Sequence, residues 1–264
     1  MAVLRSKRTL SQFEFEHSFS TLYQFTSNKI GALPKRRHQW LGLELSVKMN
    51  NIFDKIMEVN EGYFPRETKK EQKQNLINSS IKELLSTEKP LMVLWNIEGY
   101  STKQMVAWVT LFNNELEILN KMLDEPCDTQ RIQILDWRAI MSVKFMSNIF
   151  ELHRIIHGKV VRMPSKFDNT HSSLLINLID EAMYSLVKAN SKIPKTAKEY
   201  KKRRENVSNA ISALHKMQRP LIFFFNVMQY SEKTLEDITK RIDEELKMLY
   251  ALTRSDKERF GALK

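Results

Sequence analysis

Apolar residues recur every three or four positions along most of the chain, the spacing that places them on one face of an α-helix. Strand-like alternation is scarce, and short turns containing glycine or proline separate the apolar segments. Because the connections are short, consecutive helices should run antiparallel, as in an up-down-up-down four-helix bundle. The pattern predicts an all-α protein with helices at about residues 9–28, 35–60, 67–97, 101–122, 131–157, 167–190, 196–228 and 232–256.

The second half of the chain repeats the first half at an offset of 130 residues. Prolines at 34 and 90, turn residues and apolar helix positions keep this register, and Pro194 lies one position before the equivalent of Pro65. Chance does not hold three kinds of position in one register, so the sequence predicts a tandem duplication of one bundle. Matching pairs include Pro34 and Pro164, Pro90 and Pro220, Asn96 and Asn226, Tyr100 and Tyr230, Glu115 and Glu245, and Phe15 and Phe145.

The repeat also sets the expected domain boundaries. We expect a near-neutral bundle at residues 1–125, a linker at 126–130, a basic bundle at 131–256 and a charged tail at 257–264. In the third helix of each bundle, Pro90 and Pro220 should mark a kink or the start of a short separate helix, because proline removes a backbone donor. Ser101 and Gln104 have the spacing of a capping box that opens the fourth helix.

Composition narrows the class of protein. Six glycines and seven prolines in 264 residues are too few for a turn-rich β protein. No apolar run approaches the roughly 20 residues that cross a bilayer, and the N-terminus lacks the apolar block of a secretory signal. The single cysteine, Cys127, cannot form an internal disulfide, which fits a reducing compartment. We therefore expect a cytoplasmic protein with no membrane partner.

The formal net charge of +11 is divided unevenly between the two halves. Residues 1–130 hold 17 Lys+Arg against 16 Asp+Glu, a net charge of +1, and residues 131–264 hold 25 against 15, a net charge of +10. A basic domain beside a near-neutral copy of itself predicts that one copy meets a polyanion and the other meets protein. Lysine that serves only solubility is the alternative interpretation.

Three basic clusters are the candidate nucleic-acid-binding sites. One opens the second helix of the first half, and the other two occupy the start of the third helix in each half. Basic side chains beside the free N–H groups of a helix start make a good phosphate site; a solvated charged helix end is the alternative. The predicted binding residues are Lys35, Arg36, Arg37, Lys69, Lys70, Lys73, Lys198, Lys201, Lys202, Arg203 and Arg204.

Motifs for catalysis or metal binding are weak. His153 and His157 have the i, i+4 spacing that zinc can use, but no cysteine or acidic cluster clearly supplies further ligands. Their equivalents in the first half are Tyr23 and Ser27, so we interpret the pair as polar residues near a helix end. The acidic neighbours of Cys127 argue against a nucleophilic thiol, and no phosphate-binding loop or nucleophile elbow is present. The sequence predicts no enzyme activity, no cofactor and no metal site.

Two turns of the first half resemble those of a known family. Leu33-Pro34-Lys35 is followed by Leu41-Gly42, and an apolar run from Leu91 to Ile97 is followed by Ser101-Thr-Lys-Gln104. This is similar to a group of small basic four-helix-bundle proteins, which includes the accessory variability determinant of diversity-generating retroelements and the proteins encoded in 23S ribosomal RNA intervening sequences. Only the duplication extends the resemblance to the second half, which lacks the lysine and the Leu-Gly.

The resemblance implies a non-enzymatic protein that binds nucleic acid and a reverse transcriptase, with Lys35 and Arg37 at functional positions. The known relatives are single bundles that self-assemble into rings, which implies a homo-oligomer, whereas this chain fuses two copies. Together with the charge, the resemblance predicts an accessory protein that binds RNA or DNA for a reverse transcriptase or other mobile-element machinery. A structural helical adaptor that binds only other proteins is the alternative.

Overall fold

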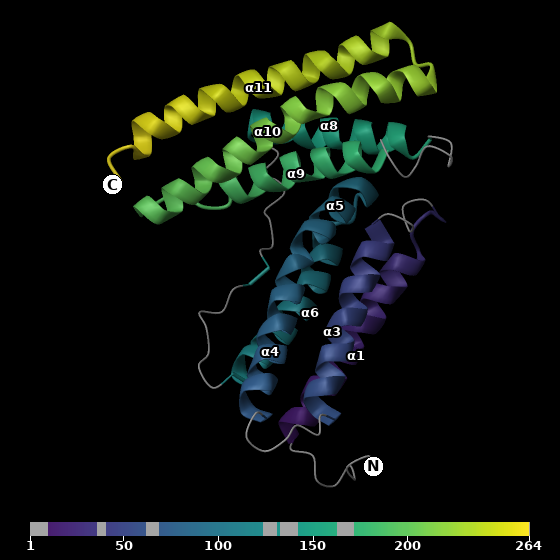
Figure 1. Ribbon diagram of the computed structural model, residues 1–264, viewed down its shortest axis with the longest axis vertical. Coiled ribbons are helices and arrows are strands. Elements are labelled where there is room, and N and C mark those ends of the chain that lie inside the picture. Colours follow the sequence, from purple (N-terminus) through teal and green to yellow (C-terminus); the bar gives the residue numbers. More distant parts are fainter. Residues whose placement is uncertain are drawn as a thin grey trace. The chain divides into compact units, whose positions relative to one another are not determined.

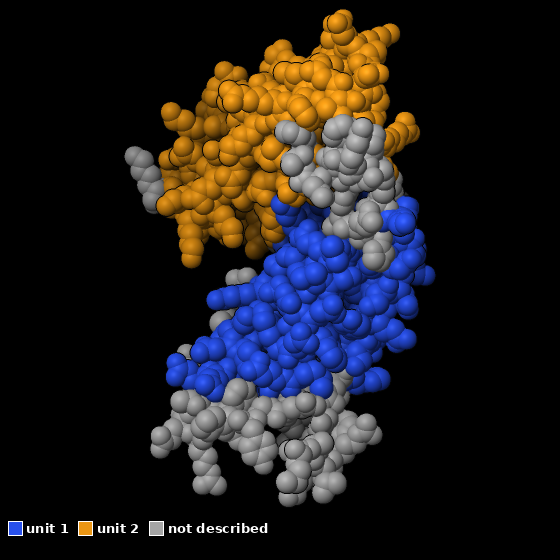
Figure 2. All heavy atoms as spheres, turned by 45° about the vertical axis from the view of Figure 1, so that its right-hand side comes forward, with its two compact units in different colours: residues 1–134 blue, residues 135–264 orange. Residues whose placement is uncertain are grey.

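Helices make up the regular structure of the protein (Figure 1). The computed structural model describes residues 10–35, 41–61, 69–123, 131–132, 142–162 and 172–263, with side chains from residue 17 onward and without those of 60, 61 and 69. Every regular element in these ranges is helical, which confirms the all-α prediction. None of these helices is both long and apolar enough to cross a bilayer. The chain divides into two compact units, residues 1–134 and 135–264 (Figure 2).

The described part of the first unit consists of four long helices and a short one. Their bounds are α1 Leu10–Gly31, α3 Leu43–Glu61, α4 Lys69–Ser86, α5 Glu88–Glu98 and α6 Thr102–Lys121. Both α1 and α4 pack against α3 and α6, so the long helices surround one core. Trp108 lies in this core at 1% exposure, and its Nε1 donates a hydrogen bond to Thr26 Oγ1 at 2.9 Å. Burial of each large apolar side chain stabilises the unit by roughly 2–3 kcal/mol.

The described residues of the second unit form four helices. They are α8 Lys144–Val160, α9 Ser173–Asn190, α10 Ala197–Met228 and α11 Glu232–Phe260. Here α8 and α10 both pack against α9 and α11. Helix α11 continues past the predicted end at residue 256, because Asp256 and Phe260 are buried and the Phe260 ring lies 6.1 Å from that of Tyr200 on α10. The end of this helix is therefore part of the packed unit.

The proline of the third helix is accommodated differently in the two units. In the first unit the helix is interrupted at Thr87, whose Oγ1 and backbone N donate to Leu84 O at 2.6 and 3.1 Å. Helix α5 then begins at Glu88, with Pro90 in its first turn, where a proline costs no helical hydrogen bond. The predicted start of a short separate helix is confirmed there. In the second unit α10 continues through Pro220.

The turn after the third helix has the same backbone form in both units. Gly99 follows α5 with a φ of 64°, and Gln229 follows α10 with a φ of 50°. Glycine adopts this left-handed conformation at little cost, whereas a residue with a Cβ pays roughly 1–2 kcal/mol. In the first unit Ser101 Oγ then accepts a bond from Gln104 N at 3.3 Å, and Gln104 Oε1 accepts one from Ser101 N at 2.9 Å. This is the predicted capping box.

Helix α8 begins later than the helix that the sequence predicts from residue 131. A helix was expected from residue 131, but residues 131–132 are not helical and α8 begins at Lys144. Ile132 is buried, its N donates to Asn113 Oδ1 at 2.9 Å, and Asn113 Nδ2 donates to Ile132 O at 3.0 Å. These bonds to α6 take the place of helical ones. Helix α9 likewise begins at Ser173, after the expected start at 167; residues 133–141 and 163–171 lie outside the described residues.

Candidate functional site

The first turns of α10 carry a cluster of exposed cations. Thr196 caps this helix, because its Oγ1 accepts a hydrogen bond from Glu199 N at 3.3 Å. Seven Lys and Arg residues stand against two Glu residues along the whole helix. The structure brings four of the predicted binding residues together on the exposed surface of its first turns. We call them the α10 basic cluster: Lys198, Lys201, Lys202 and Arg204.

Arg203 does not belong to this surface, contrary to the sequence prediction. Its Nε and Nη2 donate to the two carboxylate oxygens of Asp256 on α11, and its Nη1 donates to the carbonyl oxygen of Ala189 at the end of α9. The side chains of Arg203 and Asp256 are only 11% and 2% exposed. Removing one partner of a buried ion pair costs about 3–5 kcal/mol. Arg203 therefore holds three helices together and is not available to a phosphate.

A groove of about 260 Å³ between α10 and α11 borders the α10 basic cluster, with Arg204 and Tyr250 in its lining. Tyr250 is 47% exposed, and its hydroxyl shares a hydrogen bond of 2.9 Å with His215 Nε2. An exposed ring beside an arginine can stack on a base while the cation holds a phosphate. The groove therefore adds an aromatic contact to the basic surface.

Sequence reasoning missed four exposed residues of this surface: His215, Lys216, Arg219 and Tyr250. A signal was available for two of them. Lys216 and Arg219 each follow a member of the α10 basic cluster by 18 residues, which is five turns of 3.6 residues, so they share its face. No spacing along α10 could have identified Tyr250, which lies on α11.

The basic clusters predicted in the first unit are only partly described. Lys35 is exposed just beyond α1, and Arg36 and Arg37 lie outside the described residues. On α4, Lys70 is exposed and Lys73 is half-buried, while the side chain of Lys69 lies outside the described residues.

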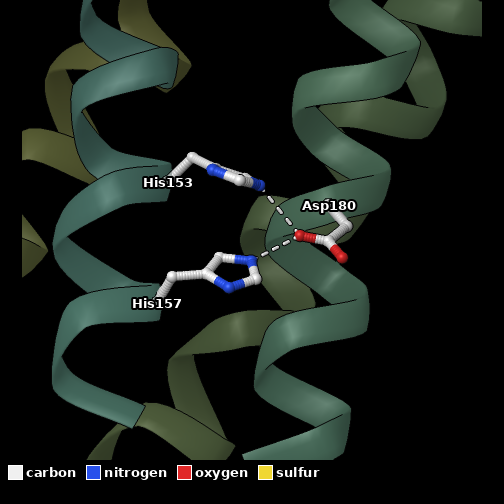
Figure 3. Close-up of side chains that lie close together, drawn as sticks. All are labelled: His153, His157 and Asp180. Atoms are coloured by element: carbon white, nitrogen blue, oxygen red, sulfur yellow. Dashed lines mark hydrogen bonds and ion pairs between the residues drawn. The ribbon is translucent and has the colours of Figure 1, made fainter. Parts of the chain in front are cut away.

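A buried cluster of three ionisable side chains joins α8 to α9 (Figure 3). His153 and His157, one turn apart on α8, direct their Nε2 atoms at the same Oδ1 of Asp180 on α9, at 2.9 and 2.7 Å. The three side chains are 0%, 3% and 6% exposed. The expectation that no acidic residue accompanies the two histidines is wrong. Asp180 comes from the next helix, and only the packing of α8 on α9 brings it close.

Burial sets the protonation of this histidine–aspartate cluster. Loss of water around His153, together with the neighbouring His157, lowers the pKa of His153 to about 4, so its ring is neutral at physiological pH. Burial alone raises the pKa of Asp180, but the interaction with His157 and the hydrogen bonds from both rings outweigh it and bring the pKa below its usual range. A neutral imidazole beside an ionised carboxylate can share hydrogen bonds or bind a divalent cation.

A neutral contact occupies the corresponding position of the first unit. Tyr23 on α1 and Asn50 on α3 lie 130 residues before His153 and Asp180, and Tyr23 Oη donates to Asn50 Oδ1 at 2.7 Å. Ser27 corresponds to His157. Both units therefore bridge their first two helices at this level, one with a neutral pair and the other with three metal-ligating groups.

Comparison with known proteins yields no assignment. No family model, curated protein or solved structure matches the chain. The resemblance to the retroelement accessory family therefore stays a prediction. What the protein does has to be argued from the residues of its own two units.

Proposed function

We propose that this chain is a non-enzymatic nucleic-acid-binding protein whose second unit holds phosphates along α10. The α10 basic cluster is the observation that carries the proposal, because it places four exposed cations on the first turns of one helix. Lys216 and Arg219 extend the same face, and the two acidic residues of α10 are Glu199, which is half-buried, and Glu205, which is exposed. Such a face attracts the RNA or DNA backbone without regard to sequence.

The α10–α11 groove supports a single-stranded segment as the form of nucleic acid bound. Unpaired bases leave their faces free to stack on an exposed ring, and Tyr250 provides one in the groove that Arg204 also lines. Stacking of this kind contributes roughly 1–3 kcal/mol for each base. Salt-sensitive phosphate contacts and a less salt-sensitive stacking contact would then act together.

We also propose that the two units are copies of one four-helix bundle. Features of the same kind recur 130 residues apart, including a left-handed residue after the third helix and a lysine over a tyrosine ring. The pairs are Gly99 and Gln229, and Lys29 over Tyr100 at 5.1 Å and Lys159 over Tyr230 at 4.6 Å. Duplication lets one copy acquire the basic helix while the other binds protein. In this proposal the partner is a reverse transcriptase or related mobile-element enzyme, as in the family that the sequence resembles.

A helical adaptor without nucleic-acid binding is the second candidate. Exposed apolar side chains favour it, because such residues suit the docking of a partner helix. Leu43 and Val47, one turn apart on α3, are 56% and 48% exposed, and Ile222 on α10 is 51% exposed. The two candidates differ in one measurable property, which is salt-dependent binding of nucleic acid.

The triple substitution K201A/K202A/R204A in the full chain tests the proposal. Its affinity for labelled RNA and DNA of unrelated sequences should fall for all of them, because phosphate contacts carry no base information. The slope of log affinity against log salt should become shallower by roughly 2–3, since each lost contact removes about 0.7–0.9. Fluorescence anisotropy over a series of salt concentrations measures both quantities.

A matched control changes the net charge equally on the neighbouring helix. Lys233, Lys240 and Lys247 are exposed on α11, where Glu236, Asp243 and Glu244 surround two of them. K233A/K240A/K247A should affect binding much less than the α10 variant. Equal losses in the two variants would show that only total charge matters. If the wild-type chain shows no salt-dependent binding of nucleic acid, the adaptor role is the remaining candidate.

A further inference from the structure

The histidine–aspartate cluster of the second unit takes no part in the proposed phosphate binding along α10. We propose that His153, His157 and Asp180 form a structural zinc site that ties α8 to α9. Two imidazole nitrogens from neighbouring turns of one helix are directed at one carboxylate oxygen from the next helix (Figure 3). The candidate ligand atoms all lie within 4.8 Å of one another.

The cluster needs only a small adjustment to accept an ion. Zinc binds imidazole nitrogen and carboxylate oxygen at about 2.0–2.2 Å, so tetrahedral ligand atoms lie about 3.4 Å apart. The two Nε2–Oδ1 distances are 2.9 and 2.7 Å. Lengthening them by roughly 0.5 and 0.7 Å brings both to the spacing of zinc ligands. Three protein ligands leave the fourth position to a water molecule.

The first unit shows that a bridge at this level does not require metal ligands. Tyr23 and Asn50 connect α1 to α3 by one neutral hydrogen bond of 2.7 Å. That bond is exposed, whereas the second unit buries two histidines and an aspartate, and burying a carboxylate costs free energy. A divalent cation offsets that cost, because it neutralises the carboxylate and uses the lone pairs of both rings.

The donor set selects the kind of ion. Two imidazole nitrogens and one carboxylate oxygen suit zinc and similar transition metals, whereas magnesium and calcium favour oxygen ligands. The near-complete burial of all three side chains at a helix–helix contact favours an ion that stays bound and stabilises the unit. We therefore assign a structural role to the site.

Metal titration of the full chain tests the site. After treatment with a chelator and its removal, the protein should bind one zinc ion per chain in calorimetry, and zinc should raise the melting temperature where magnesium and calcium do not. Cobalt(II) should give the visible absorption of a four-coordinate nitrogen–oxygen site. His157→Gln and Asp180→Asn should each weaken zinc binding at least tenfold, while His215→Gln, at an exposed histidine on α10, should keep it.

Several results would overturn the zinc site. The assignment is wrong if the wild type binds no zinc or if cobalt(II) gives no absorption of a four-coordinate site. It is also wrong if the His157→Gln variant binds zinc as tightly as the His215→Gln control. The cobalt spectrum needs no variant, so it decides the question even where a substitution prevents folding. Asp180→Asn reproduces the asparagine of the first unit, and its helix content by circular dichroism shows whether the bridge survives without a carboxylate. Nucleic-acid binding is measured separately and does not depend on this outcome.

Discussion

Glu115 on α6 and Glu245 on α11 are carboxylic acids at equivalent positions, and both side chains are 0% exposed. Burial raises the pKa of each to about 8. In the second unit Asn148 Nδ2 donates to Glu245 Oε2 at 2.8 Å, which offsets part of this rise. Both side chains are therefore mostly uncharged at neutral pH, and each unit contains a group that resists ionisation.

These two glutamates should make the protein less stable as the pH rises. Their folded pKa of about 8 exceeds the ordinary value of 4.5, so between these values the folded state keeps a proton that the unfolded state has lost. Stability then falls by up to about 1.4 kcal/mol per pH unit for each glutamate, and this loss is complete above the folded pKa. E115Q/E245Q should match the wild type near pH 5 and exceed it near pH 9, as measured by urea denaturation. Parallel pH profiles for the two proteins would contradict the prediction.

At the scale of the helix, α5 and α10 are followed by different residues with the same backbone conformation. Gly99 after α5 and Gln229 after α10 adopt the same left-handed conformation, although only glycine does so without strain. A Cβ at Gly99 would meet no atom within 4 Å, so the cost of a side chain there comes from the backbone alone. Substitutions at Gly99 and Gln229 therefore measure the free energy of the left-handed backbone that ends a helix, separately from side-chain packing.

Gln229→Gly should stabilise the protein by about 0.5–1 kcal/mol, because it removes the strain of a side chain at positive φ. The reciprocal change, Gly99→Gln, should destabilise it by about 1 kcal/mol. Thermal unfolding of the two variants beside the wild type measures both shifts. Two shifts of the same sign would show that the backbone conformation does not control stability at these turns.

At the scale of the whole molecule, the sequence predicted what local periodicity determines. The helical class, the break before Pro90 and the Ser101 capping box all depend on residues close together in the chain, and the structure has each of them. The non-helical backbone at residues 131–132 could not be predicted in the same way. Ile132 is held by Asn113, a residue on an earlier helix, and helical periodicity contains no information about that contact.

The residues of the candidate sites also differ in whether local sequence could identify them. The α10 basic cluster is continuous in sequence, so its residues could be identified before its exposure was known. Arg203 belongs to the same run of cations but turns toward Asp256, 53 residues away, and the sequence gives no sign of that pairing. Asp180 was likewise missed, because it reaches the two histidines only through the packing of two helices.

The uneven charge of the two halves predicts which unit dominates nucleic-acid binding. Residues 131–264 carry a net charge of +10 and residues 1–130 a net charge of +1. K35A/R36A/R37A in the full chain removes as much charge as K201A/K202A/R204A, so the two variants differ only in where the charge is lost. The first should reduce affinity and the salt slope less than the second, since three cations in a near-neutral unit add little to the field that attracts a polyanion. Anisotropy titrations of both variants with the same RNA and DNA at matched salt make the comparison. If the first-unit variant loses as much affinity as the α10 variant, then all or half of the binding surface must be assigned to the first unit.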